Sequence, residues 1–308
     1  MAVIKTEFTL PSTVGDLDLH AISWKPEGEV KAVIQIVHGM AEYIERYDAF
    51  ATYFAEKGIA VYGLDHIGHG ESVNDNYPLG YFGKDNECGK VFRDDAYELT
   101  KLAKAENPDK PYILFGHSMG SFVNRMYIAK YADAIDATII CGTAGPNPAI
   151  LPALALTKVL KATRGKKPGK LMNMMAFGTY NARTPKKTAF DWLSFNEKNV
   201  EDYIADPLCG FLFTNSGFRD LITLNNAICQ ADTFAAVPAD LPIFLIAGSE
   251  DPVSSYGKGI YQTYESFKKA HSNVEMKLYE GMRHEIHNET DPTEPLADIL
   301  AFVEKIAQ

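Results

Sequence analysis

The chain has 308 residues, of which 46% are hydrophobic, and its 30 basic and 40 acidic residues give a formal net charge of −10. This hydrophobic fraction supports a large buried core, and the length fits one α/β domain with an inserted subdomain. The acidic balance argues against a nucleic-acid-binding surface and against attraction to anionic membranes. We therefore expect no nucleic-acid partner.

Targeting signals are not expected either. The first residues are not a basic segment followed by a long apolar run, and no apolar run approaches the length of a bilayer span. The four cysteines are scattered and form no C-x-x-C pair, which is typical of free thiols in a reducing compartment. The sequence therefore predicts a cytoplasmic protein.

The first half of the chain predicts strands that alternate with helices. Residues 3–10 and 17–24 alternate in polarity like two half-solvated strands of a hairpin. More continuously apolar runs then predict buried strands. The predicted strands are 31–37, 59–64, 112–115 and 137–141, and the predicted helices are about 45–57, 88–106 and 121–130. Such alternation indicates right-handed βαβ units and a mostly parallel sheet with helices on both faces.

This alternation stops at about residue 143 and resumes after residue 215. The interval holds an apolar helical stretch at 150–160, a basic Gly/Pro-rich loop at 164–170 and a second apolar stretch at 171–177. The later elements are helices near 217–230, 256–270 and 293–306 and strands at 242–247 and 274–279. We predict a core made of residues 1–144 and 216–308, with residues 145–215 inserted as a helical cap over the carboxyl edge of the sheet.

A G-x-S-x-G motif joins the strand at 112–115 to the helix at 121–130. It reads Gly116-His117-Ser118-Met119-Gly120. In a nucleophile elbow the chain turns so sharply that the residues two before and two after the serine need to be small. The alternative is a glycine-rich turn with an incidental serine. We predict that Ser118 is a nucleophile and that His117 is structural.

Two further reactive side chains follow predicted strands. Asp251 follows 242–247, and His284 follows 274–279. Ligands of open α/β sheets bind at the carboxyl ends of strands, and the chain order Ser, Asp, His is that of α/β-hydrolases. His284 would take the proton of Ser118, and Asp251 would orient the imidazole. Glu250 and His287 remain alternatives for these two roles.

An oxyanion needs two backbone donors. The N–H of Met119 follows the nucleophile, and the N–H of Met40 lies in the loop after strand 31–37. The alternative for His38-Gly39 is a plain strand-terminating glycine. Asp65-His66-x-x-His69 and the H-x-x-H of His284 and His287 lack the H-E-x-x-H spacing of zinc proteases. We interpret the Asp65 loop as braced by its own side chains and predict no metal and no cofactor.

Several segments together resemble the monoacylglycerol lipase and lysophospholipase-like α/β-hydrolases. The resemblance covers about 30–145 and 235–305. It rests on His38-Gly39-Met40-Ala41-Glu42, Arg46-Tyr47, Asp65-His66-Ile67-Gly68-His69-Gly70-Glu71-Ser72, Gly116–Gly120, Gly248-Ser249-Glu250-Asp251 and Tyr279-Glu280-Gly281-Met282-Arg283-His284. It implies an α/β-hydrolase core with a helical cap, the triad Ser118, Asp251 and His284, and oxyanion donors at Met40 and Met119. Ala41 and Tyr43 depart from the glycine and histidine that the family often has.

The expected activity is hydrolysis of carboxylic esters with an apolar acyl chain, of monoacylglycerol or lysophospholipid type, through an acyl-enzyme intermediate. The substrate-binding candidates are Gly39, Ile150, Leu154, Met175 and Phe177. The apolar cap residues would line an acyl tunnel and contact lipid aggregates transiently, or would simply pack on the core. A small-ester, aminopeptidase-like or haloperoxidase-like enzyme and a low-turnover ligand-binding homologue are the alternatives. The sequence leaves chain length, head group and oligomeric state open.

Overall fold

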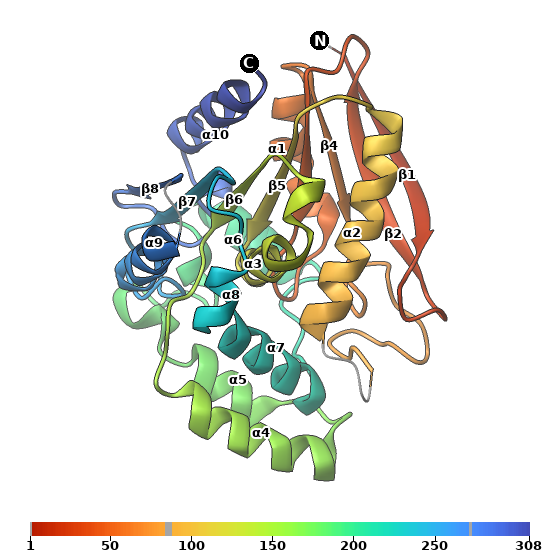
Figure 1. Ribbon diagram of the computed structural model, residues 1–308. Coiled ribbons are helices and arrows are strands. Elements are labelled where there is room, and N and C mark those ends of the chain that lie inside the picture. Colours follow the sequence, from red (N-terminus) through yellow and green to blue (C-terminus); the bar gives the residue numbers. More distant parts are fainter. Residues whose placement is uncertain (1, 84–87, 271–272) are drawn as a thin grey trace.

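The computed structural model describes residues 2–83, 88–270 and 273–308, and an eight-stranded sheet runs through its centre (Figure 1). The strand order is β1-β2-β4-β3-β5-β6-β7-β8. β1 and β2 pair antiparallel, β2 pairs antiparallel with β4, and every later pair is parallel. The strands are β1 (Val3–Pro11), β2 (Asp18–Pro26), β3 (Ala32–Val37), β4 (Ile59–Leu64), β5 (Tyr112–His117), β6 (Ala137–Cys141), β7 (Ile243–Gly248) and β8 (Val274–Tyr279). The predicted mostly parallel sheet is confirmed.

The central strands are apolar throughout because helices cover both of their faces. Every residue of β3 to β7 is buried. On one face lie α1 (Asp48–Ala55) and α10 (Thr293–Ile306), which pack Phe54 and Phe302 against the sheet. On the other face lie α2 (Cys88–Glu106), α3 (Met119–Tyr131), α8 (Ala231–Ala235) and α9 (Lys258–Ala270). The predicted two-sided α/β architecture is therefore confirmed.

The inserted segment between β6 and α7 (Asn215–Ile228) is helical. It contains α4 (Ile150–Arg164), α5 (Lys170–Phe177), α6 (Glu197–Ala205) and 3-10 turns at Tyr180–Arg183 and Asp191–Leu193. α7 contacts α4 and α5 on one side and α2 and α3 on the other. Figure 1 shows α4 and α5 at the end of the molecule opposite the two termini. Because α7 contacts both the inserted helices and the core helices, the predicted boundary between cap and core at residues 215 and 216 stays a prediction.

Some helices differ from the predictions, and the short α8 was not predicted at all. The helix predicted at 45–57 is a 3-10 turn at Ile44–Tyr47 followed by α1. α6 was not predicted as a helix, although Asn196 caps it by accepting a hydrogen bond from the N–H of Asn199 at 3.3 Å. The capping signal was present in the sequence, but the helix is only nine residues long.

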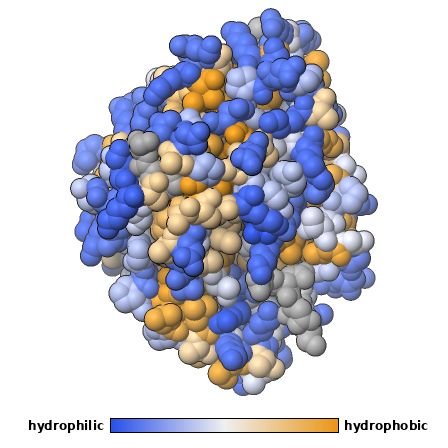
Figure 2. All heavy atoms as spheres, in the orientation of Figure 1, coloured by the Kyte–Doolittle hydropathy of each residue, from blue (hydrophilic) through white to orange (hydrophobic). Residues whose placement is uncertain are grey.

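Several of the most exposed large apolar side chains of the described residues lie on α4 and α5. They are Leu151, Val159, Leu171, Met174 and Met175. Figure 2 shows apolar atoms among polar ones at the end of the molecule where these helices lie. None of the helices described combines the length and the apolar character needed to cross a membrane.

Candidate active site

Ser118 lies at the junction of β5 and α3 in a strained backbone conformation, with φ 55° and ψ −120°. A Cβ atom on Gly116 would lie 2.5 Å from the carbonyl oxygen of Gly120, and one on Gly120 would lie 1.9 Å from that of Val37. The two glycines are therefore required by close backbone approach. The N–H of Ser118 donates to the carbonyl of Cys141 at 3.0 Å, which ties the turn to β6.

The approach of Gly120 to Val37 brings the start of α3 against the end of β3. Met119 is the first residue of α3, so its N–H has no acceptor within the helix and lies at the positive end of the helix dipole. Met40 and Met119 line the same cavity as Ser118. A Cβ on Gly39 would lie 3.2 Å from the Cβ of Ser118 and 2.4 Å from Oε1 of Glu42. The two predicted oxyanion residues thus flank Ser118.

Asp251 and His284 meet at the carboxyl ends of β7 and β8. Nδ1 of His284 lies 3.0 Å from Oδ1 of Asp251, which is fully buried. The same oxygen accepts a hydrogen bond from the N–H of Val253 at 2.8 Å. The neighbouring Glu250 is only partly buried. The carboxylate at the histidine is therefore that of Asp251 rather than its sequence alternative.

His284 and His287 lie in different surroundings. His284 lines the cavity with Ser118. The ring of His287 instead stacks on Tyr47, with 5.1 Å between centroids, and lies 4.8 Å from the ring of His117. Burial lowers the pKa of His287 to about 3, so its imidazole is neutral. Of the two histidines, His284 has the contacts expected of a base.

His117 points into the fold, as predicted. Its Nδ1 lies 3.1 Å from the hydroxyl of Tyr47, and its Nε2 lies 3.2 Å from the carbonyl oxygen of His284. Glu42 accepts hydrogen bonds from the N–H of Gly39 at 2.5 Å and from Tyr47 at 2.9 Å. Burial alone would raise the pKa of Glu42, but His117 and Arg46 lower it well below its usual value. This buried anion therefore fixes the loop that carries Met40.

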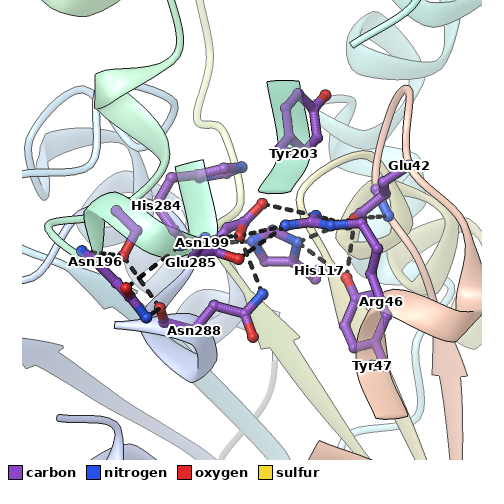
Figure 3. A network of polar contacts seen from close by, with 12 residues as sticks. Glu42, Arg46, Tyr47, His117, Asn196, Asn199, Tyr203, His284, Glu285 and Asn288 are labelled. Atoms are coloured by element: carbon purple, nitrogen blue, oxygen red, sulfur yellow. Dashed lines mark hydrogen bonds and ion pairs between the residues drawn. The ribbon is translucent and has the colours of Figure 1, made fainter. Parts of the chain in front are cut away.

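Arg46 and Glu285 extend this network toward the cap (Figure 3). Nη1 of Arg46 donates to Glu42 at 2.6 Å and to Glu285 at 2.9 Å, and Nη2 donates to the second oxygen of Glu285 at 2.9 Å. Burial would raise the pKa of Glu285, but Arg46 lowers it to about 2. Asn199 of α6 donates to Glu285 at 2.8 Å. The network thus joins the loop after β3, the residue after His284 and the cap.

A largely apolar cavity of about 670 Å³ lies between the sheet and the cap, and Ser118 and His284 are among its lining residues. Of the predicted substrate-binding residues, Ile150, Met175 and Phe177 line it. Leu154 and Gly39 are not among the described residues that do so. Ala153 takes the place expected for Leu154, because α4 presents positions three apart to the cavity rather than four apart.

The Asp65 loop is braced by its own carboxylate, as predicted. Asp65 accepts hydrogen bonds from the N–H groups of Ile44 at 2.7 Å and Glu71 at 2.9 Å. His66 and His69 stack on phenylalanine rings.

A different group, His117, Cys141 and His287, brings ligand-type atoms within 4.8 Å of one another. Both nitrogens of His117 already have partners, and burial raises the pKa of the Cys141 thiol well above its usual value. These residues therefore fit a packed core better than a metal.

Several residues around the site have no role predicted from sequence patterns: Arg46, Arg283, Glu285, Trp192 and Asn199. Trp192 lines the cavity, and its ring lies 5.2 Å from that of His284. The signal available for Arg283 and Glu285 was a pair of charged residues on either side of a candidate catalytic histidine. Their partners in the cap lie 92 and 86 residues earlier in the chain, and Arg46, which also bonds Glu285, lies 239 residues earlier, so no local pattern reveals these contacts.

Comparison with known proteins agrees with this geometry. The family described as serine aminopeptidase, S33 (Hydrolase_4) matches residues 28–291. The monoglyceride lipase of Mus musculus is 29% identical over 269 residues, 86% of this chain and 79% of that protein. The monoacylglycerol lipase of Mycolicibacterium smegmatis is 28% identical over 286 residues, 91% of this chain and 90% of that protein.

Among solved structures, a highly thermostable carboxyl esterase from Bacillus coagulans in complex with glycerol is similar over the whole of both chains. Its TM-score is 0.92, and the two sequences are 30% identical. The sheet order, the elbow and the length of the family match lead to one conclusion. The chain belongs to the Hydrolase_4 family and is a monoglyceride lipase-like α/β-hydrolase, a class of carboxylic ester hydrolases.

Proposed function

We propose that the chain is a serine esterase that cleaves carboxylic esters with an apolar acyl chain, of monoacylglycerol or lysophospholipid type, through an acyl-enzyme intermediate. One observation carries the proposal. A serine on a strained strand-to-helix turn and a histidine bonded to a buried aspartate line the same apolar cavity. A serine hydroxyl, a histidine base and an aspartate that orients the base are the groups of the serine-hydrolase triad.

In the acylation step His284 takes the proton from Oγ of Ser118 while that oxygen attacks the ester carbonyl. Asp251 holds Nδ1–H of the ring and stabilises the imidazolium that forms. The N–H groups of Met40 and Met119 bind the oxyanion, and each such donor typically supplies about 3 kcal/mol. His284 then returns the proton to the departing alcohol oxygen, which leaves the acyl group on Ser118.

Deacylation repeats these steps with water as the nucleophile. His284 takes a proton from the water, whose oxygen attacks the acyl carbonyl. Collapse of the second tetrahedral intermediate releases the carboxylic acid and returns the proton to Ser118. The residues described supply the base, the orienting acid and the oxyanion donors, so the proposal needs no cofactor.

The cavity supports an apolar acyl group. Ile150, Met175 and Phe177 line it from the cap, and methionine side chains adapt to varied apolar shapes. The names of the relatives favour the glycerol ester class, and the Bacillus coagulans esterase was solved with glycerol. We propose that the exposed apolar residues of α4 and α5 contact lipid aggregates transiently. Cytoplasmic residence is proposed on the four free cysteines.

The family description raises an aminopeptidase as a second candidate. Such an enzyme needs an unpaired carboxylate to bind the ammonium group of its substrate. Among the described residues that line the cavity, the acidic ones are Glu42 and Glu285, and both are already bonded to Arg46. Both carboxylates are therefore already neutralised by Arg46 and are not available to bind an ammonium group, which favours an ester substrate.

Replacing Ser118 tests the proposal. We expect Ser118→Ala to lower turnover of a p-nitrophenyl ester by several orders of magnitude and to abolish labelling by a fluorophosphonate. Retained turnover in this variant would contradict the proposal. With the wild-type protein, release rates from monoacylglycerols, lysophospholipids, short esters and aminoacyl anilides of graded length identify the substrate class.

A further inference from the structure

The loop that carries His284 is held from the cap side by one continuous stretch of the inserted segment. We name residues 283–289 the histidine loop and residues 191–199 the clasp. Nη1 of Arg283 donates to the carbonyl oxygens of Asp191 at 2.8 Å and Ser194 at 3.0 Å. The guanidinium carbon also lies 3.6 Å from the ring centroid of Phe195. The residue before His284 is therefore fixed to the clasp by its side chain.

The residue after His284 is fixed to the clasp twice. The backbone N–H of Glu285 donates to the carbonyl of Leu193 at 2.8 Å. Its carboxylate accepts from Nδ2 of Asn199 at 2.8 Å, and Oδ1 of Asn199 in turn accepts from Arg46 at 3.2 Å. Figure 3 shows Asn199 beside Glu285 and Arg46, with Asn196 and Asn288 on the side of Glu285 away from Arg46.

Glu289 closes the histidine loop. One carboxylate oxygen accepts from the N–H of Arg283 at 2.7 Å, which joins the two ends of the loop. The other accepts from the hydroxyl of Ser194 at 2.9 Å and from the N–H of Phe195 at 2.8 Å. Arg283, Ser194 and Glu289 are all buried. These are charge-assisted hydrogen bonds away from water, so each one strongly restricts the loop.

Two hydrogen bonds hold His284 itself. Its ring is bonded to Asp251 at 3.0 Å, and its carbonyl accepts from His117 at 3.2 Å. The direction of the ring therefore depends on the backbone at Arg283 and Glu285, which the clasp holds. A displacement of about 1 Å at a catalytic group can cost roughly 100-fold in rate.

We propose that Arg283 is a positioning residue that aligns His284 by anchoring the histidine loop to the clasp. This inference rests on the proposed function, in which His284 is the base. The proposal assigns different roles to two parts of the inserted segment. α4 and α5 cover the acyl cavity, and residues 191–199 hold the base in place.

The test compares Arg283→Ala and Arg283→Lys with the wild type on p-nitrophenyl butyrate. We expect Arg283→Ala to lower kcat about 10- to 100-fold while KM changes less than about threefold. Arg283→Lys restores part of kcat, because an ammonium group can still donate to one of the two carbonyls. The low-field proton resonance of the His284–Asp251 hydrogen bond should shift or broaden in Arg283→Ala. Unchanged kcat together with an unchanged resonance would overturn the proposal.

Arg219→Ala is the matched control. Nη1 of Arg219 donates to the carbonyl of Leu154 at 2.5 Å, so it is also an arginine bonded to a cap carbonyl, but on α4. We expect it to keep kcat within about threefold of the wild type and to keep the low-field resonance. If the control loses as much kcat as Arg283→Ala, the effect belongs to cap anchoring in general and the proposal is wrong.

Asn199→Ala provides a second variant if Arg283→Ala does not fold. It removes the hydrogen bonds to Glu285 and Arg46, and we expect a smaller loss of kcat and the same change in the resonance. Normal values for both in a folded Asn199→Ala protein would also overturn the proposal. Ser118→Ala distinguishes failure of the proposed function from failure of this inference. An active Ser118→Ala protein contradicts the proposed function. The low-field resonance still reports whether Arg283 positions His284.

Discussion

Gly142 has no Cβ atom, and this leaves space for the imidazole of His284, the candidate base. It follows β6 with φ 62°, and a Cβ there would lie 3.1 Å from Cε1 and 3.2 Å from Nδ1 of His284. Both the backbone conformation and the close contact favour glycine. Sequence patterns predicted Ser118 from its G-x-S-x-G motif and Asp251 and His284 from their place in the loops after two strands, but they gave no role to Gly142.

We expect Gly142→Ala to lower kcat at least tenfold, because the new methyl group displaces the imidazole. It should also lower the free energy of unfolding by about 1–3 kcal/mol through backbone strain. Ester turnover and urea unfolding measure the two effects.

Gly15→Ala separates strain from contact. Gly15 has φ 87°, and nothing lies within 4 Å of a Cβ built there. This control should show the stability loss without the loss of kcat. Equal kcat in Gly142→Ala and Gly15→Ala would mean that the contact with His284 has no consequence.

Among the elements, the βα alternation was predicted correctly, and so was the position of three cap residues at the cavity, Ile150, Met175 and Phe177, whereas Leu154 of α4 was not. Central strands are recognised because burial on both faces requires continuous apolar runs, as in β3. Packing on α7 sets the rotation of α4 about its own axis, and the sequence does not reveal this rotation. The residue that lines the cavity is therefore Ala153 rather than the predicted Leu154. α6 was not predicted because it is short and its buried apolar residues pack mainly against other residues of the inserted segment.

Phe177 at the end of α5 provides a test of the acyl cavity. We expect Phe177→Ala to raise KM for a long-chain p-nitrophenyl ester about tenfold relative to the acetate, since the lost apolar contact is worth roughly 1–2 kcal/mol. KM values across a series of acyl lengths measure it.

Leu171→Ala is the control on the same helix. Leu171 is 46% exposed and is not among the described residues that line the cavity. It should leave the dependence of KM on chain length unchanged. A uniform effect of Phe177→Ala on all esters would contradict an acyl role for α5.

At the scale of the whole molecule, buried neutral histidines make stability depend on pH. Burial lowers the pKa values of His38, His66, His69 and His287 from their usual value of 6.5, and that of His287 falls to about 3. Below pH 6.5 the unfolded chain binds protons that the folded chain does not. The free energy of unfolding therefore falls as the pH is lowered below about 6.5, and His287 alone lowers it by about 1.4 kcal/mol per pH unit toward pH 3.

His287→Phe should reduce this dependence. The ring of His287 stacks on Tyr47 and lies near Phe50, and neither of its nitrogens has a hydrogen-bond partner. Phenylalanine keeps the stacking and cannot be protonated. We expect the loss of stability between pH 6.5 and 5 to be about 2 kcal/mol smaller than in the wild type, as measured by urea unfolding. The same slope in both proteins would mean that His287 titrates normally in the folded state.

The position of α7 between α2 and α3 on one side and α4 and α5 on the other has a consequence for engineering. A chimera that exchanges only residues 145–215 for those of a relative would leave α7 facing a foreign surface, and it would remove the stretch that holds the histidine loop. A graft intended to change substrate preference while keeping turnover should therefore replace α4 and α5 together with the residues of α7 that contact them, and retain residues 191–199. The substrate preference and the turnover of such a chimera would then depend on which residues form the boundaries of the exchanged segment.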